Sequence, residues 1–433
     1  MRIFPSKPAF KRLCLVAGLM LFAGHAAAAE SLQQAWDTAL AVDRSLKAAR
    51  ENTAAAASLL EAAKSARLPN VVLEAGYTAL DNTPGAKADF FGQSLQMPLG
   101  QKDSFAYKAM ATLPLYTGGR IGRNIDAAAA GVDAAKLGEA ADEENLKLRV
   151  AEAYVGVLRA RRLLEVANSH VRSLESHERD VQNLLDEDLV AKNDLLSVHV
   201  ALADARQRVL QVANAVDLAQ AAYNRLLGRP LGQVVQLEEL TPQNDTPALG
   251  GLTARALERR SELAALARQI GALHQQAAAV RGEDRPQVAL SGGYNYQENR
   301  YQMYEGQWMV TLGVKWNVFD GGVVNHRASA IDRQAAALTE QREDLSSVIG
   351  LQVRQAWLDV AETRKRLAVT QSAIAQAEEN LRVVRERYAN GLSTNTEVLD
   401  AETMRVNSEA NHAAALYDAA LAGLRLKRAV GEL

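Results

Sequence analysis

The sequence predicts a mixed α+β membrane protein, in which four membrane-crossing β-strands per chain are continued by long helices in a coiled coil. Three observations support this class. The chain of 433 residues contains two similar halves, each half has strands with period-two alternation of apolar side chains, and each half has a long helical segment without proline. Apolar residues make up 48% of the chain but aromatic residues only 5%, which favours long helices over β-rich globular domains.

Residues 1–29 have the pattern of a secretory signal peptide. A basic start precedes the apolar run 13–22, which is too short to span a bilayer comfortably, and small residues then offer a cleavage site near Ala29. These features favour a cleaved leader over the alternative, an uncleaved membrane anchor. The only cysteine, Cys14, precedes most of the apolar run, so we expect no lipid anchor and no disulfide in the mature chain.

Composition and motifs exclude several classes of function. The net charge of −2 shows no basic footprint for nucleic acid. No nucleophile motif and no phosphate-binding loop is present, so we expect no enzyme and no cofactor. Histidines occur singly, with His170 and His177 on one helical face, and we interpret them as surface or packing residues rather than metal ligands.

The two halves of the chain match each other with constant spacing. A shift of 203 residues brings Gly118-Gly119 onto Gly321-Gly322, and the match continues to the ends of both halves. Upstream the matching shift is 217 residues, so 217 − 203 = 14 additional residues must lie between Pro69 and Gly118. A connection between two strands is the natural place for them. We therefore predict repeats at 30–228 and 251–433, joined by a linker at 229–250.

Two segments, at about 70–117 and 287–319, contain the predicted strands. Of the 22 aromatic residues, 13 lie in or beside these segments, and strands of about ten residues with aromatic-tipped apolar faces are typical of a transmembrane β-barrel. The alternative is a soluble hairpin with one buried face, which the leader and the lack of a second sheet disfavour. Every second residue forms the predicted apolar faces, which run from Val71 to Tyr77, Phe105 to Leu113, Val288 to Tyr296 and Trp308 to Val318.

The helical segments predict the wall of a cylinder. Segments 120–186 and 323–389 would each be about 100 Å long, at about 1.5 Å per residue, and end in turns near 188 and 391. Two short helices together have about the length of one long helix, so we expect them to stack end to end beside it. The predicted short helices are 31–66, 194–227, 253–281 and 397–430.

The strand count predicts an oligomer. A sheet with open edges is not tolerated in lipid, and the smallest transmembrane barrels need about eight strands. With four strands per chain, two chains would close a barrel with a filled interior, and three chains would leave a lumen. Periodicity alone is compatible with either number.

Several short motifs, in a duplicated order, resemble the TolC family of outer-membrane efflux and secretion channels. At the strand-to-helix junctions they are LPLYTGG (113–119) and VFDGG (318–322). Leu68-Pro69 and Arg285-Pro286 precede the first strand of each half. The second helical turn carries Tyr388, Gly391, Glu397 and Asp400 in the pattern Y-x-x-G-x-x-x-x-x-E-V-L-D. The resemblance extends over essentially the whole mature chain.

The resemblance implies a homotrimer in the outer membrane of a Gram-negative bacterium, with one shared barrel in the lipid and a tunnel of helices in the periplasm. It implies a passive exit duct of a tripartite efflux pump or type I secretion system. A periplasmic adaptor and an inner-membrane transporter of RND, ABC or MFS type would open its tip. The alternative function is a periplasmic adaptor, but an adaptor should have one helical hairpin flanked by lipoyl-like β-segments, whereas this chain has two hairpins.

The resemblance also implies a selective constriction at the second turn. In the family, acidic residues at the positions of Glu397 and Asp400 ring the periplasmic mouth and favour cations. The two residues are three apart and therefore share one face of a helix. For Glu397 the alternative is a favourable charge in the first turn of its helix.

Residues of both turns are candidates for a gate latch. Asp194 and Tyr388 match residues that hold the closed state in the family, although Tyr388 could also be an ordinary interhelical packing residue. Ser393 stands where some members have a latch arginine, and Lys192 is the candidate substitute. Asp188 stands where glycine is usual, so the sequence leaves the backbone of the first turn open.

The tips of the two turns are candidates for contact with the adaptor. They are Leu189, Val190, Gly391 and Leu392. Apolar side chains at an exposed helical turn are typical of a docking surface, which is the basis of this prediction.

Overall fold

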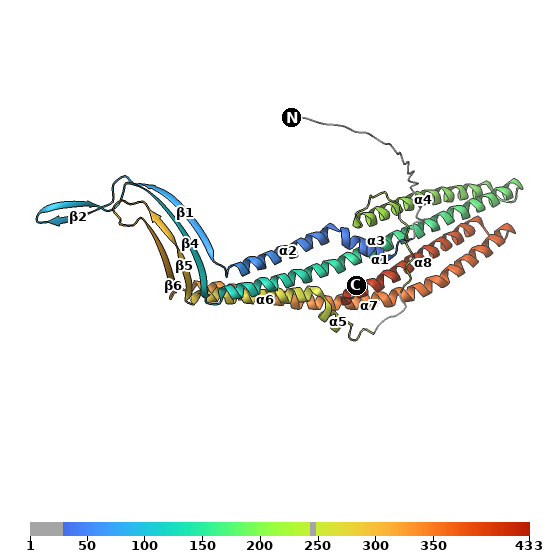
Figure 1. Ribbon diagram of the computed structural model, residues 1–433. Coiled ribbons are helices and arrows are strands. Elements are labelled where there is room, and N and C mark those ends of the chain that lie inside the picture. The colour runs from blue at the N-terminus through green and yellow to red at the C-terminus, as the bar shows by residue number, and fades with distance from the viewer. Residues whose placement is uncertain (1–28, 243–247) are drawn as a thin grey trace, which may run out of the picture.

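The chain forms an elongated molecule with a β-sheet at one end and helices along the rest (Figure 1). The computed structural model describes residues 29–242 and 248–433, so the predicted signal peptide lies outside the described residues up to position 28. The first half contains α1 (Leu32–Val42), α2 (Arg44–Ser65), β1 (Asn70–Ala79), β2 (Gly85–Phe90), β3 (Gln93–Pro98), β4 (Asp103–Thr117), α3 (Arg120–Asp186) and α4 (Lys192–Leu226). The second contains α5 (Leu252–Arg259), α6 (Ser261–Arg281), the 3₁₀ turn η1 (Gly282–Asp284), β5 (Gln287–Gln297), β6 (Gly306–Lys315), α7 (Val323–Ala389) and α8 (Asn395–Val430).

The two long helices, α3 and α7, are 67 residues each and run from the sheet to the opposite end of the molecule (Figure 1). Helices α2 and α4 lie one after the other along α3, and α6 and α8 lie in the same way along α7. Helix α6 also contacts α3, so it joins the two groups near the sheet. This is the end-to-end stacking that the segment lengths predicted. Among the described residues, no helix combines the length and apolarity needed to cross a bilayer.

The first short helix of each half is broken, whereas the sequence predicted single helices at 31–66 and 253–281. Asp43 ends α1 and starts α2, because its carboxylate accepts a hydrogen bond from the backbone N–H of Leu46 at 2.9 Å. Arg260 separates α5 from α6 in an extended conformation, and its buried guanidinium pairs with Glu262 at 3.0 Å. Both breaks depend on side-chain contacts that a periodic pattern of apolar residues does not reveal.

Paired glycines make the sharp connection from strand to long helix. Gly118 and Gly119 have φ angles of 65° and 89°, in the left-handed region that favours glycine. A Cβ atom on Gly118 would collide with the carbonyl oxygen of Gly282, the first residue of η1, so no side chain fits there. The second half uses Gly321 and Gly322 with φ angles of 69° and 88°.

The four long strands form one antiparallel sheet in the order β1-β4-β5-β6. The register places residues of like character in rows across it. One row is Leu73, Ala109, Tyr294 and Trp308, and the adjacent row is Glu74, Lys108, Asn295 and Gln307. The predicted apolar faces of all four strands therefore lie on one side, while the other side is polar and carries an ion pair between Glu74 and Lys108 at 2.8 Å.

No part of the chain within residues 29–242 and 248–433 covers the apolar side of this sheet. Leu73, Trp308 and Val310 are 78–81% exposed. Strands β1 and β6 each have one unpaired edge. Strand β6 ends at Lys315, earlier than the predicted limit near 319, because Lys315 pairs with Gln287, the first residue of its neighbour β5.

Between β1 and β4 the chain forms an additional hairpin, β2–β3, that extends beyond the far end of the sheet (Figure 1). It spans residues 85–98, which is 14 residues and equals the extra length that the two internal shifts predicted in this region. The sequence located the insertion but did not indicate that it would be two strands.

Candidate functional site

The turns that join α3 to α4 and α7 to α8 lie together at the end of the molecule farthest from the sheet (Figure 1). Both have the same backbone hydrogen bonds. In the first, the N–H groups of Asp188 and Leu189 bond the carbonyls of Leu185 and Leu184 at 2.9 and 2.8 Å. In the second, Gly391 and Leu392 bond Tyr388 and Arg387 at 2.9 and 2.8 Å. Each turn is thus a Schellman motif with one left-handed residue after the helix.

Asp188 adopts this left-handed conformation with φ 58°, where the second turn has Gly391 with φ 71°. The structure therefore resolves the backbone that the sequence left open: the turn is unchanged, and an aspartate is strained into the position of a glycine. We expect Asp188→Gly to stabilise the first turn by about 1 kcal/mol, and the reciprocal change Gly391→Asp to destabilise the second by a similar amount. Local hydrogen exchange of the residues beside each turn measures both. Equal exchange in all three proteins would contradict the assignment of strain.

The four predicted docking residues lie at the extreme tips. Leu189 and Leu392 occupy equivalent places after the left-handed residue and are 65% and 68% exposed. Val190 is half-buried against the apolar cluster below the turns, and Gly391 has no side chain to present. The tips therefore offer one exposed leucine each.

The predicted constriction residues lie on the first turns of α8. The carboxylate of Glu397 accepts hydrogen bonds from the hydroxyls of Ser393 at 2.6 Å and Thr394 at 3.2 Å, while its N–H bonds the Thr394 hydroxyl. The Ser393 bond, with help from Thr394, lowers the pKa of Glu397. Asp400 is exposed, and within the described residues its carboxylate has no partner in the same chain. Glu397 thus takes part in capping the helix, and its lowered pKa keeps it ionised at neutral pH.

Of the predicted latch residues, Tyr388 is buried and Lys192 is exposed. Tyr388 is 7% exposed and its hydroxyl has no hydrogen-bond partner among the described residues. Burial, and secondarily the negative charge of Asp194, raise the pKa of Tyr388, so these two predicted residues lie close together. Lys192 is exposed at the start of α4, and no described side chain of its own chain pairs with it.

A buried polar contact beside Tyr388 joins both helical hairpins. Nε2 of His177 on α3 lies 2.8 Å from Oδ1 of Asn395 at the start of α8, and the two residues are 3% and 4% exposed. The Asn395 amide nitrogen donates to the backbone carbonyl of Asp194 on α4 at 3.1 Å. Because that nitrogen is a donor, the amide oxygen must accept from His177, which places the proton of the neutral ring on Nε2. The ring of Tyr388 lies edge-on to His177, with ring centres 5.5 Å apart.

About two turns farther from the tip, a buried ionic network joins α3, α7 and α8. Glu402 is 1% exposed, accepts from the Ser173 hydroxyl at 2.9 Å and pairs with Arg405 at 2.6 Å. Arg385 reaches the same Ser173 at 2.6 Å and lies 3.5 Å from Glu402. The carboxylate is therefore shared between two arginines from different helices.

Neither Asn395 nor Glu402 carried a predicted role, and His177 was expected only as a packing or surface residue. A signal was present for Glu402 and Arg405. They follow the buried Val398 by four and seven residues, which places charges on the stripe of α8 that should be apolar. No comparable signal marks Asn395, because an amide after a capping threonine is ordinary in a helical start.

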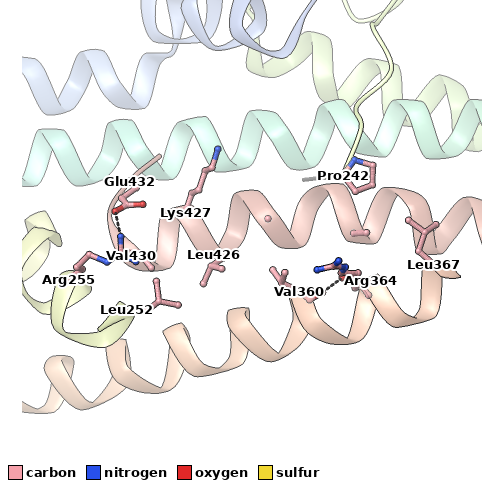
Figure 2. Close-up of a pocket in the computed structure, with 13 residues that line it drawn as sticks. Pro242, Leu252, Arg255, Val360, Arg364, Leu367, Leu426, Lys427, Val430 and Glu432 are labelled. Atoms are coloured by element: carbon pink, nitrogen blue, oxygen red, sulfur yellow. Dashed lines mark hydrogen bonds and ion pairs between the residues drawn. The ribbon is translucent and has the colours of Figure 1, made fainter. Parts of the chain in front are cut away.

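A separate pocket of about 280 Å³ lies at the middle of the molecule, between α5, α7 and α8 (Figure 2). Leu252, Leu426 and Val430 form an apolar floor that is also part of the core between these helices. At the rim, Arg255 pairs with Glu432 at 3.5 Å. None of the residues that line the pocket belongs to either helical turn. Among residues 29–242 and 248–433, no group of three potential metal ligands occurs.

Comparisons with known proteins agree with this architecture. The family model described as "Outer membrane efflux protein" matches residues 35–229 and 252–432. Outer membrane protein TolC of Escherichia coli (strain K12) is 21% identical over 423 residues, covering 94% of this chain and 83% of that protein. Alkaline protease secretion protein AprF of Pseudomonas aeruginosa is 24% identical over 312 residues, covering 67% of this chain and 62% of that protein. A solved structure of CusC superposes with a TM-score of 0.80 at 18% identity, covering 92% of both chains.

Proposed function

Because this chain belongs to the outer membrane efflux protein family, we propose that it works as a homotrimer with a shared β-barrel, a helical tunnel and a gate at the two helical turns. The chain is an outer-membrane exit duct, a passive channel and not an enzyme. The alternative of a periplasmic adaptor has no support, since the family match extends over both halves of the chain. Residues 1–29 would direct export as a cleaved signal peptide without lipid attachment.

The proposal of a trimeric barrel rests on the unpaired edges and the exposed apolar side of the sheet in a single chain. Its two edge strands, β1 and β6, are each unpaired on one side, and its apolar side is uncovered. Pairing β6 of one copy with β1 of the next satisfies these backbone groups in lipid. Three copies supply twelve strands, which leaves a lumen lined by the polar side and turns the apolar side to the membrane. The halves 30–228 and 251–433, with the linker 229–250, would be repeats of one design.

The tip would be the closed gate of the duct. Three copies of α8 bring six carboxylates, from Glu397 and Asp400, around one narrow mouth. Asp400 is free of partners in the described chain, and the depressed pKa of Glu397 keeps that group ionised well into mild acid. A ring of fixed negative charge attracts cations and repels anions. Asp194 and Tyr388 would latch the closed tip, with Lys192 free to contact a neighbouring copy.

The exposed tips would receive the partners that open the gate. Leu189 and Leu392 present apolar side chains at the end of each turn, with Val190 and Gly391 beside them. A periplasmic adaptor coupled to an inner-membrane transporter of the RND, ABC or MFS type would dock there. The transporter supplies energy, so the duct can serve an efflux pump or a type I secretion system.

We expect Glu397→Ala with Asp400→Ala to raise single-channel conductance and to weaken cation preference in planar bilayers, because the narrowest ring loses its charge. Glu397→Gln with Asp400→Asn keeps the side-chain volume and separates the effect of charge from that of width. The matched control is Glu379→Ala with Glu386→Ala, which removes two exposed carboxylates from α7 that pair with Arg382. If the double variants and the unaltered protein give the same conductance and the same cation preference, Glu397 and Asp400 do not form the constriction.

A further inference from the structure

The β2–β3 hairpin has an apolar side that no described part of the chain covers. Its cross-strand pairs Ala86–Met97 and Ala88–Leu95 lie on one side, together with Phe90 at the tip, while Lys87–Gln96 lies on the other. The apolar side chains are largely exposed: Phe90 71%, Phe91 99%, Leu95 56% and Met97 50%. A two-stranded hairpin is only marginally stable alone in water, so this side requires a cover.

The base of the hairpin is held firmly. The N–H of Leu99 bonds the carbonyl of Pro84 at 2.8 Å, which closes the hairpin at its root. Asn299, in the β5–β6 connection and only 6% exposed, donates its side-chain amide to the carbonyl of Leu99 at 3.0 Å. The hairpin therefore extends from a fixed root at the rim of the sheet, as Figure 1 shows.

Lipid tails are a poor candidate for the cover. The paired rows of β1 and β4 end at Ala79 and Asp103, and the residues that follow toward the hairpin include Asp81 and Lys102. These charged residues stand between the apolar side of the sheet and the hairpin. Charges mark the end of the hydrocarbon layer, so the hairpin lies beyond the membrane.

A second copy of the chain fits the geometry. The hairpin is inserted at β1, which is the edge that a neighbouring copy must pair with in a closed barrel. Twelve strands spaced about 4.8 Å apart and tilted by about 40° close a cylinder with a radius of about 12 Å. Strands of six residues reach about 20 Å at about 3.4 Å per residue. A hairpin rooted at the rim is therefore long enough to reach the threefold axis.

We propose that the β2–β3 hairpins of three copies fold across the outer mouth of the barrel and bury their apolar sides against one another, as a cover over the exit. This inference rests on the trimeric barrel proposed above. It gives the duct a second constriction, at the end opposite to the gate, that is made only by the first half of each chain. The second half has no insertion at the corresponding place, because β5 and β6 are joined by a short connection.

Cysteine cross-linking tests whether the hairpins meet. In a full-length chain with Cys14→Ser, Phe91→Cys at the tip should form disulfide-linked dimers between copies under mild oxidation. Lys87→Cys, on the polar side and nearer the root, is the matched control and should form far fewer. Absence of cross-links at Phe91 in a trimer that remains intact on unheated gels would overturn the cover while leaving the proposed duct in place. Failure to form any trimer would instead refute the proposed function.

Excision of the hairpin tests whether it covers the mouth. Pro84 and Leu99 are adjacent at the root, so residues 85–98 can be replaced by two glycines without moving the sheet. Gln307→Cys, in the polar row of the sheet, reports entry to the lumen from outside the cell. We expect excision to increase several-fold the rate at which a bulky, membrane-impermeant maleimide labels this cysteine. Equal rates with and without the hairpin would show that the mouth is open, whether the hairpins contact lipid, another protein or only water.

Discussion

Glu402→Ala should loosen the tip of the duct more than any other single change considered in this chain. Glu402 is 1% exposed and is shared by Arg405 of its own helix and Arg385 of α7, with Ser173 of α3 as a third partner. Removing the carboxylate leaves the buried Arg405 with only Glu409 as an acidic partner, and it removes the acidic partner of the partly exposed Arg385. Breaking a buried pair by deleting one partner costs about 3–5 kcal/mol. We expect local opening of α8 near residues 398–409 to become easier by that amount.

Hydrogen exchange of the α8 amides measures this opening directly. Loss of the network also weakens the attachment of α8 to α3, so channel recordings should show more frequent opening without an adaptor. Glu379→Ala is the control, since this exposed carboxylate of α7 pairs with Arg382 on the surface and its removal should change neither measurement. Unchanged exchange in the Glu402 variant would mean that the network does not hold the helices together.

Acid should open the tip through His177. Burial, reinforced by the positive charge of Arg385, lowers the pKa of this imidazole in the packed tip, although Asn395, Asp180 and Glu402 act in the opposite direction. Separation of the hairpins exposes the ring to water and restores its ordinary pKa of 6.5. Protons therefore bind the open form more strongly. The closed form has its full stability above pH 6.5 and loses it as the pH falls from there toward the lower pKa of the closed structure.

Recordings between pH 7.5 and pH 5 should show an open probability that rises below about pH 6.5. His177→Gln keeps a donor toward Asn395 but does not titrate, so its open probability should depend much less on pH. His199→Gln is the control, because His199 is half-exposed on α4 beside Glu178 and should leave the acid response intact. An identical acid response in the unaltered protein and His177→Gln would assign the effect to other groups.

Local sequence determined most of the architecture. The apolar alternation of the strands predicted which side chains share a side of the sheet, because successive residues of a strand point in opposite directions. Proline-free segments bounded by glycine pairs predicted α3 and α7, since glycine alone accepts the left-handed backbone at their starts without strain. The difference between two internal shifts predicted a 14-residue insertion. The first two signals are carried by neighbours in the chain, and the third by comparison of its two halves.

The tertiary structure decided what lies inside the tip. His177, Asn395 and Asp194 are far apart in sequence, and only the packing of α3, α8 and α4 brings their polar atoms within 2.8 to 3.1 Å. The same packing buries Glu402 between two arginines and leaves the apolar side of the β2–β3 hairpin uncovered. Periodicity assigns a residue to one side of its own helix or strand. It carries no information about which distant side chain will face it, and hydrogen bonding in a dry interior depends on that partner.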